Sequence, residues 1–469
     1  MDFLILQDSI VFFLFLAISL IYFLIVAKKN GFNIYTIILS SIYIICSYSS
    51  YNIMVKPIHD FNIAIPRTGI YHFKVIGPLA PIDIIFLLLF AFVFMKKIMT
   101  KSLFSYQIVK NSAVISKYIT LQGVLLAIIS SMGFVAYIKN GGQGEVNDQL
   151  IYCRGVIYFL VSIFLFQKSC ENLKGFDFYK LFKIFCVIDV LNLMSGFISS
   201  IIFHDYVWER YGVKITIIDQ DKATAYFVIY ALLITSLLFT RPLKNKVIYI
   251  STLLIGIFMF YNMYKFVFSL AFLYIIYEFF INAIRGRIAV VKMSLLTVGL
   301  VAVMSTVLML SNSKAMNTRS TQFGDYWEYT GSKFPAIALG IGFGGQYYSP
   351  SDTDDQGEIK QIDVENGTAN YRKSIQTPFL NQIKNAGLIG FFITIFFAIF
   401  AVIYMAKINI SLPVNILYNA ICFNIMWFMC SGSIMLQPTP IAIVTVSKLL
   451  LLFYLLRERE KNNNATVKV

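Results

Sequence analysis

The chain has 469 residues, of which 58% are hydrophobic and only 13% are charged, and its mean hydropathy is +0.72. These values exclude a soluble globular protein, and the long continuous apolar runs exclude the alternating strands of a transmembrane β-barrel. Much of the net charge of +15 lies in short segments between the apolar runs. It therefore indicates membrane topology and attraction to anionic lipid, and no nucleic-acid partner is expected.

The apolar runs predict membrane-spanning helices along nearly the whole chain. One crossing of the bilayer needs about 20 mostly apolar residues, so we predict about thirteen spans, with an error of about one or two. The first run lacks a basic segment and a small-residue cleavage site, so it is predicted to be a span and not a signal peptide. The predicted spans are 9–27, 33–55, 79–95, 118–138, 150–167, 182–203, 222–240, 247–264, 266–284, 293–310, 387–406, 413–432 and 436–456.

The predicted fold class is all-α, a polytopic transmembrane helical bundle of about 12–13 spans. Residues 1–310 hold the first ten spans, 311–386 form a large loop, 387–456 hold the last three spans, and 457–469 form a tail. If the spans alternate, clusters of lysine and arginine fall on one side. Because positive charge marks the cytoplasmic side, we expect a cytoplasmic C-terminus and an extracytoplasmic loop. The clusters are at 28–29, 96–117, 168–183, 241–246, 285–287 and 457–459.

The loop at 311–386 is polar, aromatic and charged. It contains Arg319, Trp327 and the glycine-rich run Gly340–Gly345, and it leads into Ser374–Gly390. A transporter rarely needs so large an ordered loop outside the membrane. An enzyme that acts on a lipid-linked substrate at the membrane surface does need one.

Several basic residues are predicted at the outer ends of spans, against the usual charge bias. For Lys265 and Arg372, snorkelling to lipid phosphates is an equally good explanation. Arg154, Arg210 and Arg319 together favour a site for a diphosphate, since guanidinium groups hold phosphate oxygens bidentately and stay charged. Cations fixed beside a departing diphosphate would stabilise the transition state more than the ground state.

Two motifs in the loop resemble known ligand-binding motifs, but we do not expect either to bind that ligand. Gly340–Gly345 matches a dinucleotide pattern but follows no buried strand, so close backbone packing or a phosphate-binding nest is favoured. Asp352 and Asp354 resemble a metal-binding pair, but a solvated acidic loop is the preferred interpretation. The three histidines lack metal-ligand spacing, and neither a metal nor a nucleotide cofactor is expected.

Two charged residues are predicted inside spans. Asp189 lies nearer the cytoplasmic end of its span, and Lys448 lies at a similar depth in the last span. Buried charges in a membrane need partners, so we predict a structural ion pair between them. Arg154 is too far from Asp189 in depth to be that partner.

Several of these short segments follow one another in an order that resembles a known family. Arg154 heads a span, and the glycine-rich run follows Arg319 and Trp327. In this order the chain resembles the O-antigen polymerase and O-antigen ligase superfamily of bacterial membrane glycosyltransferases, over about residues 150–390. The resembling pieces are Arg154, Arg210–Gly212 with Asp219–Asp221, Asn262–Lys265, Arg319 with Trp327 and Gly340–Gly344, and Gln376–Leu380 with Gly387–Gly390.

The chain departs from the family pattern at two positions. Gln376 occupies the position of the ligase-type histidine, and glutamine cannot act as a general base near neutral pH. This departure favours a polymerase over a ligase. Lys265 stands where the family often has arginine; it keeps the charge but loses the bidentate geometry.

The resemblance implies a GT-C-like glycosyltransferase in the bacterial inner membrane. It would be an O-antigen or capsule-type polymerase that transfers a growing glycan from undecaprenyl diphosphate to a lipid-linked repeat unit, with no metal. Arg319, Arg154 and Arg210 would hold the diphosphate, while Lys265, Arg372, Gln376 and Trp327 would shape the sugar site. The catalytic base stays open between Asp325 and Glu328.

The implied partners are the undecaprenyl-diphosphate-linked oligosaccharide, membrane lipid and a chain-length-regulating membrane protein. Two alternatives are retained. One is an O-antigen ligase. The other, from a different class, is a flippase or transporter of lipid-linked oligosaccharides, in which Arg154 and Arg210 would line a central pathway.

Overall fold

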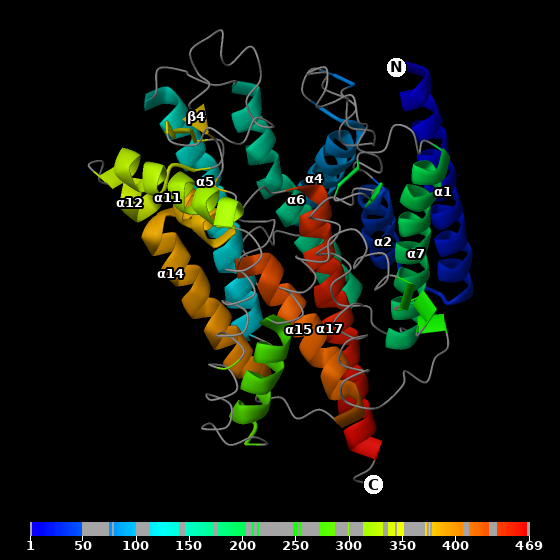
Figure 1. Ribbon diagram of the computed structural model, residues 1–469. Coiled ribbons are helices and arrows are strands. Elements are labelled where there is room, and N and C mark those ends of the chain that lie inside the picture. Colours follow the sequence, from blue (N-terminus) through cyan, green and yellow to red (C-terminus); the bar gives the residue numbers. More distant parts are fainter. Residues whose placement is uncertain are drawn as a thin grey trace.

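The computed structural model of the protein (Figure 1) is mostly helical over the residues that it describes. These residues are 2–48, 75–76, 79–99, 113–139, 146–171, 177–202, 209–210, 213–214, 247–248, 250–251, 253–254, 273–286, 299, 313–331, 336–342, 345–350, 371–372, 375, 378–406, 412–430 and 439–466.

Most of the predicted spans coincide with a helix. The predicted spans 222–240, 247–264 and 293–310 lie wholly or mostly outside the described residues. The others match the helices α1 (Asp2–Lys29), α2 (Ile34–Ser47), α4 (Pro81–Met99), α5 (Ala113–Lys139), α6 (Val146–Glu171), α7 (Phe178–Ile202), an unlabelled helix (Leu273–Ile284), α14 (Pro378–Ala406), α15 (Leu412–Cys430) and α17 (Pro440–Thr466).

Within the described residues, three helices are both long and apolar enough to cross a membrane. Their apolar segments are Ile10–Lys29, Cys153–Glu171 and Pro440–Arg459. Of the first segment 28% is buried inside the protein, and of the last 94%. The chain is therefore a helical membrane protein in which α17 is an interior helix and α1 a peripheral one.

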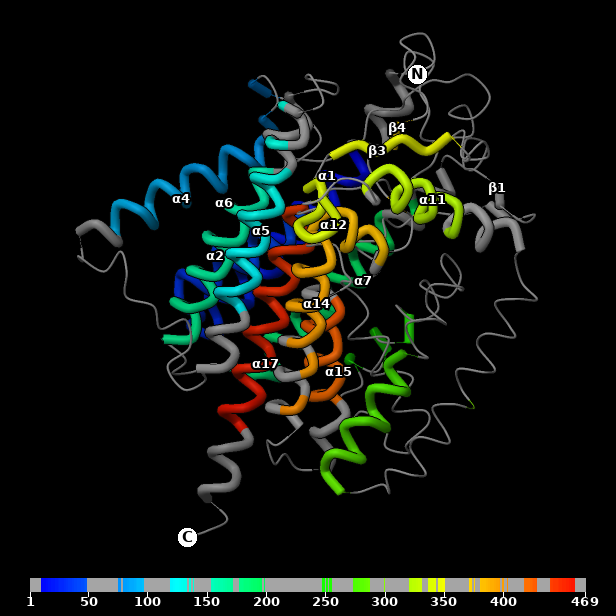
Figure 2. The backbone as a smooth tube through the Cα atoms, turned by 90° about the vertical axis from the view of Figure 1, so that its left-hand side faces the viewer, coloured from blue at the N-terminus to red at the C-terminus, as the bar shows by residue number. Residues whose placement is uncertain are grey.

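The helices around α17 lie side by side (Figures 1 and 2). Successive neighbours α5, α6, α17, α15 and α14 close a ring, since α14 also packs against α5. On the other side of α17, α2 packs against both α6 and α17, and α1 and α7 pack against each other. The last predicted span thus occupies the middle of the helical array.

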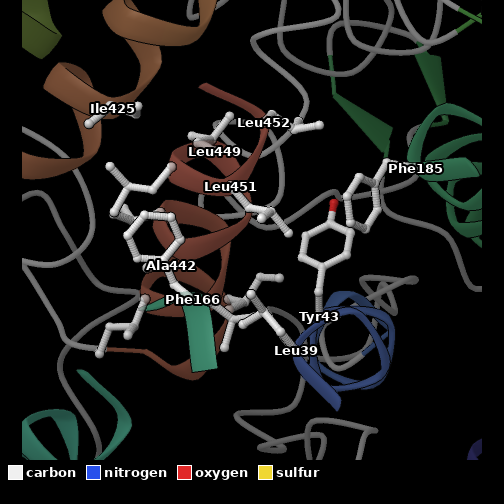
Figure 3. Close-up of a cluster of buried hydrophobic side chains, with 14 of the residues drawn as sticks. Leu39, Tyr43, Phe166, Phe185, Ile425, Ala442, Leu449, Leu451 and Leu452 are labelled. Atoms are coloured by element: carbon white, nitrogen blue, oxygen red, sulfur yellow. The ribbon is translucent and has the colours of Figure 1, made fainter. Parts of the chain in front are cut away.

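A continuous apolar core joins these helices. Figure 3 shows Tyr43 of α2 facing Phe185 of α7, with leucines of α17 and Phe166 of α6 beside them. The rings of Tyr43 and Phe185 meet edge to face at 5.4 Å, and Phe166 meets Tyr454 of α17 at 5.8 Å. Burial of such aromatic and aliphatic side chains is the main favourable term in the packing.

Basic residues collect where several helix ends meet. Asn33, just before α2, donates from Nδ2 to the Ser169 carbonyl near the end of α6 at 3.3 Å. The Arg459 guanidinium lies 4.2 Å from the centroid of the Tyr179 ring, which connects the end of α17 to the start of α7. We call this the cation-rich end; its described basic residues are Lys28, Lys29, Lys96, Lys168, Lys180, Lys183, Arg457 and Arg459.

At the other end of the helical array lies a small unit that we call the cap (Figures 1 and 2). It comprises α11 (Ser313–Gly331), α12 (Ala336–Leu339), the described residues of 340–350 and 371–375, and α14 up to Gly387. Within it, β3 (Tyr347–Tyr348) pairs antiparallel with β4 (Tyr371–Arg372). The unit has a small hydrophobic core of its own, formed by Tyr326, Ile341, Tyr347, Ile375 and Ile383.

The boundary between loop and span differs from the prediction. Helix α14 begins at Pro378, inside the segment predicted to be loop, and it is interrupted at Gly387, where φ is 68° and ψ is −178°. Since 387 is where the sequence predicted a span to begin, hydropathy identified the second of two helical segments. The first segment is polar, and it serves as the base of the cap.

Candidate functional site

The cap is attached to α14 through a close backbone approach at glycines. Ile341 N donates to the Lys384 carbonyl at 2.9 Å, and Gly342 N donates to the Asn385 carbonyl at 3.1 Å. At Gly340, where φ is 73°, a Cβ atom would lie 2.4 Å from the Asn385 carbonyl oxygen. At Gly387 a Cβ would lie 2.2 Å from the Ala338 carbonyl oxygen. The glycine-rich run therefore serves close packing, one of the two functions predicted for it.

A buried lysine reinforces this junction. Lys384 is only 1% exposed, and its Nζ donates to the Gly342 carbonyl at 3.1 Å and to Asn385 Oδ1 at 3.0 Å. Both acceptors are neutral oxygens. A positive charge is thus held inside the cap, at the turn that follows α12.

A second polar group lies between α11 and the β3–β4 pair. Ser349 Oγ donates to Asp325 Oδ2 at 2.6 Å, and the rings of Tyr326 and Tyr347 meet edge to face at 5.5 Å. Arg372 is opposite Tyr347 in the strand register and is 4% exposed. Because paired residues on adjacent strands share a face, Arg372 lies on the buried face with Tyr347.

The described part of the cap therefore buries more positive than negative charge. Its buried charged side chains are Arg372, Lys384 and Asp325, two basic and one acidic. Buried charges are costly unless they are compensated. This excess is suited to an anionic ligand.

The two candidate bases on α11 have different environments. Asp325 is 8% exposed and accepts the hydrogen bond from Ser349. Glu328 is exposed, as is its neighbour Trp327, at 42%. The Trp327 ring lies 6.0 Å from that of Phe323. Of the two carboxylates, Glu328 is the one accessible from outside the protein.

The position of Arg319 on α11 follows from the helix alone, since its side chain lies outside what the structure describes. Position 319 precedes Gln322, Tyr326 and Thr330 by 3, 7 and 11 residues, spacings that share one helix face. All three of these residues are buried. Position 319 therefore lies on the same face of α11 as the buried residues Gln322, Tyr326 and Thr330.

Arg154 lies outside the cap, in an ion pair that the sequence did not predict. Its Nη1 bonds the carboxylate of Asp83 in α4, which also accepts a hydrogen bond from the Tyr158 hydroxyl. Asp83 Oδ2 accepts from Ala80 N at 2.7 Å as well, so it caps the start of α4. Asp83 is 2% and Arg154 20% exposed.

The remaining predicted site residues are only partly described. Arg210 ends β1 (Glu209–Arg210), which pairs with β2 (Val213–Lys214) in a hairpin, and nothing beyond its backbone is described. Lys265 and Gln376 lie outside the described residues, as do Asp352, Asp354 and the three histidines. The ion pair of Arg154 is with Asp83 of α4, and the strand of Arg210 pairs with β2, so neither of these described interactions involves a residue of the cap.

The ion pair predicted inside the spans is confirmed. Lys448 Nζ lies 3.6 Å from Asp189 Oδ2, and the Tyr43 hydroxyl donates to Asp189 Oδ1 at 2.7 Å. The ammonium group also lies 3.8 Å from the centroid of the Tyr43 ring, a favourable cation–π geometry. Both charged side chains are nearly inaccessible, at 5% and 0%.

Sequence reasoning missed Asp83 and Lys384. An acidic residue inside a predicted span was a usable signal for Asp83, because such residues usually have a partner or a function. Lys384 stands in a segment that was quoted for its resemblance only, and nothing in the sequence indicated that it is buried. Its role depends on the turn at Gly342, which approaches from another part of the chain.

Comparison with known proteins gives no relative. A scan against protein-family models and searches of curated proteins and solved structures found no match to this chain.

Proposed function

We propose that the protein is a polysaccharide polymerase that joins undecaprenyl-diphosphate-linked repeat units in the bacterial inner membrane. It would be a polytopic bundle with the cap on the extracytoplasmic side and the cation-rich end in the cytoplasm, following the positive-inside rule. The observation that carries the proposal is the cap itself. It is a polar unit that buries two basic side chains and one acidic side chain in its described part, and it lies at the end of the helices opposite the basic residues.

The proposed reaction is a displacement at the donor sugar. A hydroxyl of the acceptor repeat unit attacks the anomeric carbon, the bond to the diphosphate oxygen breaks, and undecaprenyl diphosphate leaves with the electron pair. The hydroxyl proton passes to a carboxylate, for which accessible Glu328 is the better candidate on α11. Basic groups that face the leaving diphosphate would lower the barrier by a few kcal/mol each.

The basic residues would have distinct roles in this scheme. Arg319, on the inward face of α11, would contact the diphosphate together with the buried Arg372 and Lys384. Arg154 would be oriented by Asp83, so it presents a fixed guanidinium with a reduced net charge. Arg210, Lys265 and Gln376 keep their predicted roles at the substrate, and exposed Trp327 would stack on a sugar ring.

The test is polymer length in a strain that makes the Arg319→Ala variant. We expect long-chain polysaccharide to disappear while single-repeat products and the amount of protein in the membrane are unchanged. Arg459→Ala is the matched control, because it removes the same charge at the cation-rich end and should leave the polymer intact. Normal chain lengths in a stably produced Arg319→Ala variant would refute the role.

A transporter of lipid-linked oligosaccharide is the second candidate, and one observation favours it. The buried pair of Asp189 and Lys448 is the kind of intramembrane charge found in ion-coupled transporters. A deletion strain separates the two functions. Loss of a polymerase leaves unpolymerised repeat units on the outer face of the membrane, whereas loss of a flippase traps them inside. An O-antigen ligase differs from both, since single repeats would still polymerise in its absence.

A further inference from the structure

Helices α1, α2, α17 and α7 close a second ring, which we call the four-helix ring. Helix α1 packs against α2 and α7, and α17 packs against the same two helices. Two side-chain hydrogen bonds join α2 and α7 within it. The Tyr43 hydroxyl donates to Asp189 Oδ1 at 2.7 Å, and Asn192 Nδ2 donates to the Ser47 carbonyl at 2.6 Å. The interior of the four-helix ring is therefore polar, although it lies among membrane helices.

The ion pair inside the four-helix ring is a loose one. Lys448 Nζ lies 3.6 Å from Asp189 Oδ2, beyond the usual length of a hydrogen bond. The same ammonium group lies 3.8 Å from the centroid of the Tyr43 ring and 5.0 Å from that of Phe185, two rings that face each other (Figure 3). Asp189 Oδ2 is buried and accepts no hydrogen bond of ordinary length from a described residue. This carboxylate oxygen can therefore accept a further ligand.

Neutral oxygen atoms lie on the same faces of α2 and α17. Ser40 precedes Tyr43 by three residues, and Thr445 precedes Lys448 by three, so each pair shares a helix face. Ser40 Oγ and Thr445 Oγ1 are buried and make no hydrogen bond to the part of the chain that the structure describes. Thr36 Oγ1 repeats this pattern one helical turn before Ser40. The ion pair is therefore accompanied by hydroxyl oxygens that are available as ligands.

The other titratable groups near the Asp189 carboxylate are uncharged at neutral pH. They are Tyr43 and Tyr48 of α2 and Cys186 of α7 itself, and tyrosine and cysteine side chains keep their protons at that pH. From α1, Ser19 contributes a neutral hydroxyl, which lies 2.7 Å from the Tyr48 hydroxyl. Among the described residues, the ion pair thus sets the charge of the interior.

We propose that the four-helix ring binds one monovalent cation at Asp189, in exchange for a proton of the Lys448 ammonium group. Hard cations take oxygen ligands such as carboxylate and hydroxyl oxygens. A cation at Asp189 Oδ2 takes the place of the lysine charge, and Lys448 Nζ passes one proton to water. The total charge of the interior is then the same before and after the exchange. A divalent ion would leave an uncompensated positive charge among membrane helices, which is costly, so the site suits a monovalent ion.

Lysine is the basic residue that fits such an exchange. A buried lysine can lose its proton, whereas the guanidinium group of arginine stays charged in proteins. The site lies in α7 and α17, outside the cap, so it does not depend on the proposed glycosyl transfer.

The experiment measures thermal unfolding and proton release of the full-length protein in detergent, in weakly buffered solution, as NaCl is added. We expect Na⁺ to raise the Tm of the wild type and to release about one proton for each Na⁺ bound. Because a proton leaves, the apparent affinity for Na⁺ should rise about tenfold for each pH unit. Choline chloride at the same concentration controls for ionic strength, since its cation is too large for the site.

Two variants assign the exchange to the ion pair. Asp189→Asn should lose both the rise in Tm and the proton release. Lys448→Met should still bind Na⁺, with a larger rise in Tm than the wild type, but should release no proton and show no dependence of affinity on pH. Glu278→Gln is the matched control, because it changes another buried carboxylate, 6% exposed, to an amide; it should keep both effects.

The double variant Asp189→Asn with Lys448→Met covers the case in which Asp189→Asn does not fold, since it removes both charges of the pair. It should show neither effect of Na⁺. Proton release that persists in this variant would place the exchange elsewhere and overturn the proposal. An equal rise in Tm with choline chloride would show a general effect of salt and overturn it too, as would the absence of proton release from the wild type.

Discussion

The helical array and the cap bury charge in different ways. In the array, Lys448 faces the carboxylate of Asp189 and the ring of Tyr43, among apolar side chains. In the cap, Lys384 donates to two neutral oxygens, the carbonyl of Gly342 and Oδ1 of Asn385. An apolar surrounding requires that charge be neutralised by a nearby opposite charge. The neutral oxygens of Gly342 and Asn385 accept hydrogen bonds from the buried ammonium group of Lys384 but carry no opposite charge.

The two regions also differ in how they pack. The array depends on large side chains, such as Phe166 and Tyr454. The cap depends on the absence of side chains at Gly340 and Gly387, where backbone meets backbone. Changes in the cap should therefore act through backbone overlap, and changes in the array through cavities and unpaired charge.

Gly387→Ala should have the largest effect on stability. Its Cβ would overlap the Ala338 carbonyl oxygen at 2.2 Å, on a residue with φ of 68°. We expect a loss of more than about 4 kcal/mol, or a cap that does not fold. Thermal unfolding and protease cleavage of the cap would measure it. Gly31→Ala is the control, because Gly31 has φ of 64° but nothing within 4 Å; only the strain of about 1 kcal/mol is expected. Equal effects of the two changes would contradict the backbone contact.

Lys448→Met tests the paired charge of the array. It leaves the Asp189 carboxylate buried without its cation, and we expect a loss of about 3 kcal/mol in the free energy of unfolding. Combining it with Asp189→Asn, which keeps an acceptor for the Tyr43 hydroxyl, should recover most of the loss. A double variant as unstable as the single one would show that the two charges do not stabilise each other.

The stability of the cap should depend on pH in the alkaline range because of Tyr326. Burial raises the pKa of Tyr326 to about 12 from an ordinary value of 10.0. The unfolded phenol therefore ionises first, so stability is intact below pH 10 and falls by about 2–3 kcal/mol as the pH rises toward 12. Unfolding measured below and above pH 10 should show this fall, and Tyr326→Phe should lose less over the same range. Identical pH profiles would show that the Tyr326 hydroxyl is accessible to water.

Trp327→Ala should have the smallest effect on stability, under about 0.5 kcal/mol, because the side chain is 42% exposed. If Trp327 stacks on a sugar, polymer yield should still fall by about tenfold. Tyr348→Ala removes another exposed aromatic side chain of the cap, at 40%, and serves as the control for yield. Equal yields in the two variants would remove the sugar-binding role of Trp327.

Much of the fold was predictable because it depends on local hydropathy. The predicted spans 150–167, 413–432 and 436–456 correspond to α6, α15 and α17. The pairing of Asp189 with Lys448 was also predictable, since depth in a membrane can be counted along each helix. The role of the Gly340–Gly345 run in close packing was predicted as one of two alternatives, because glycine is the residue that allows such an approach.

The sites were less predictable, because each contains residues from distant parts of the chain, and hydropathy does not predict which distant residues meet. Asp83 and Arg154 are 71 positions apart, and nothing local indicates that their helices meet there. The polar first segment of α14 and the helix α11 lie in a stretch that hydropathy assigns to loop. These two segments are buried because they contact one another. A hydropathy scale assigns a value to each residue separately and therefore cannot predict such a contact.

Composition by itself determined that this chain is a helical membrane protein, since so apolar a chain can satisfy its backbone in lipid through internal hydrogen bonds. Tertiary structure alone decided that the last helix stands in the middle, that Asp83 holds Arg154, and that a lysine is enclosed beneath a glycine turn. These arrangements depend on which helix faces pack against each other. The hydropathy of a segment shows that one of its faces is apolar, but it does not show which other helix packs against that face.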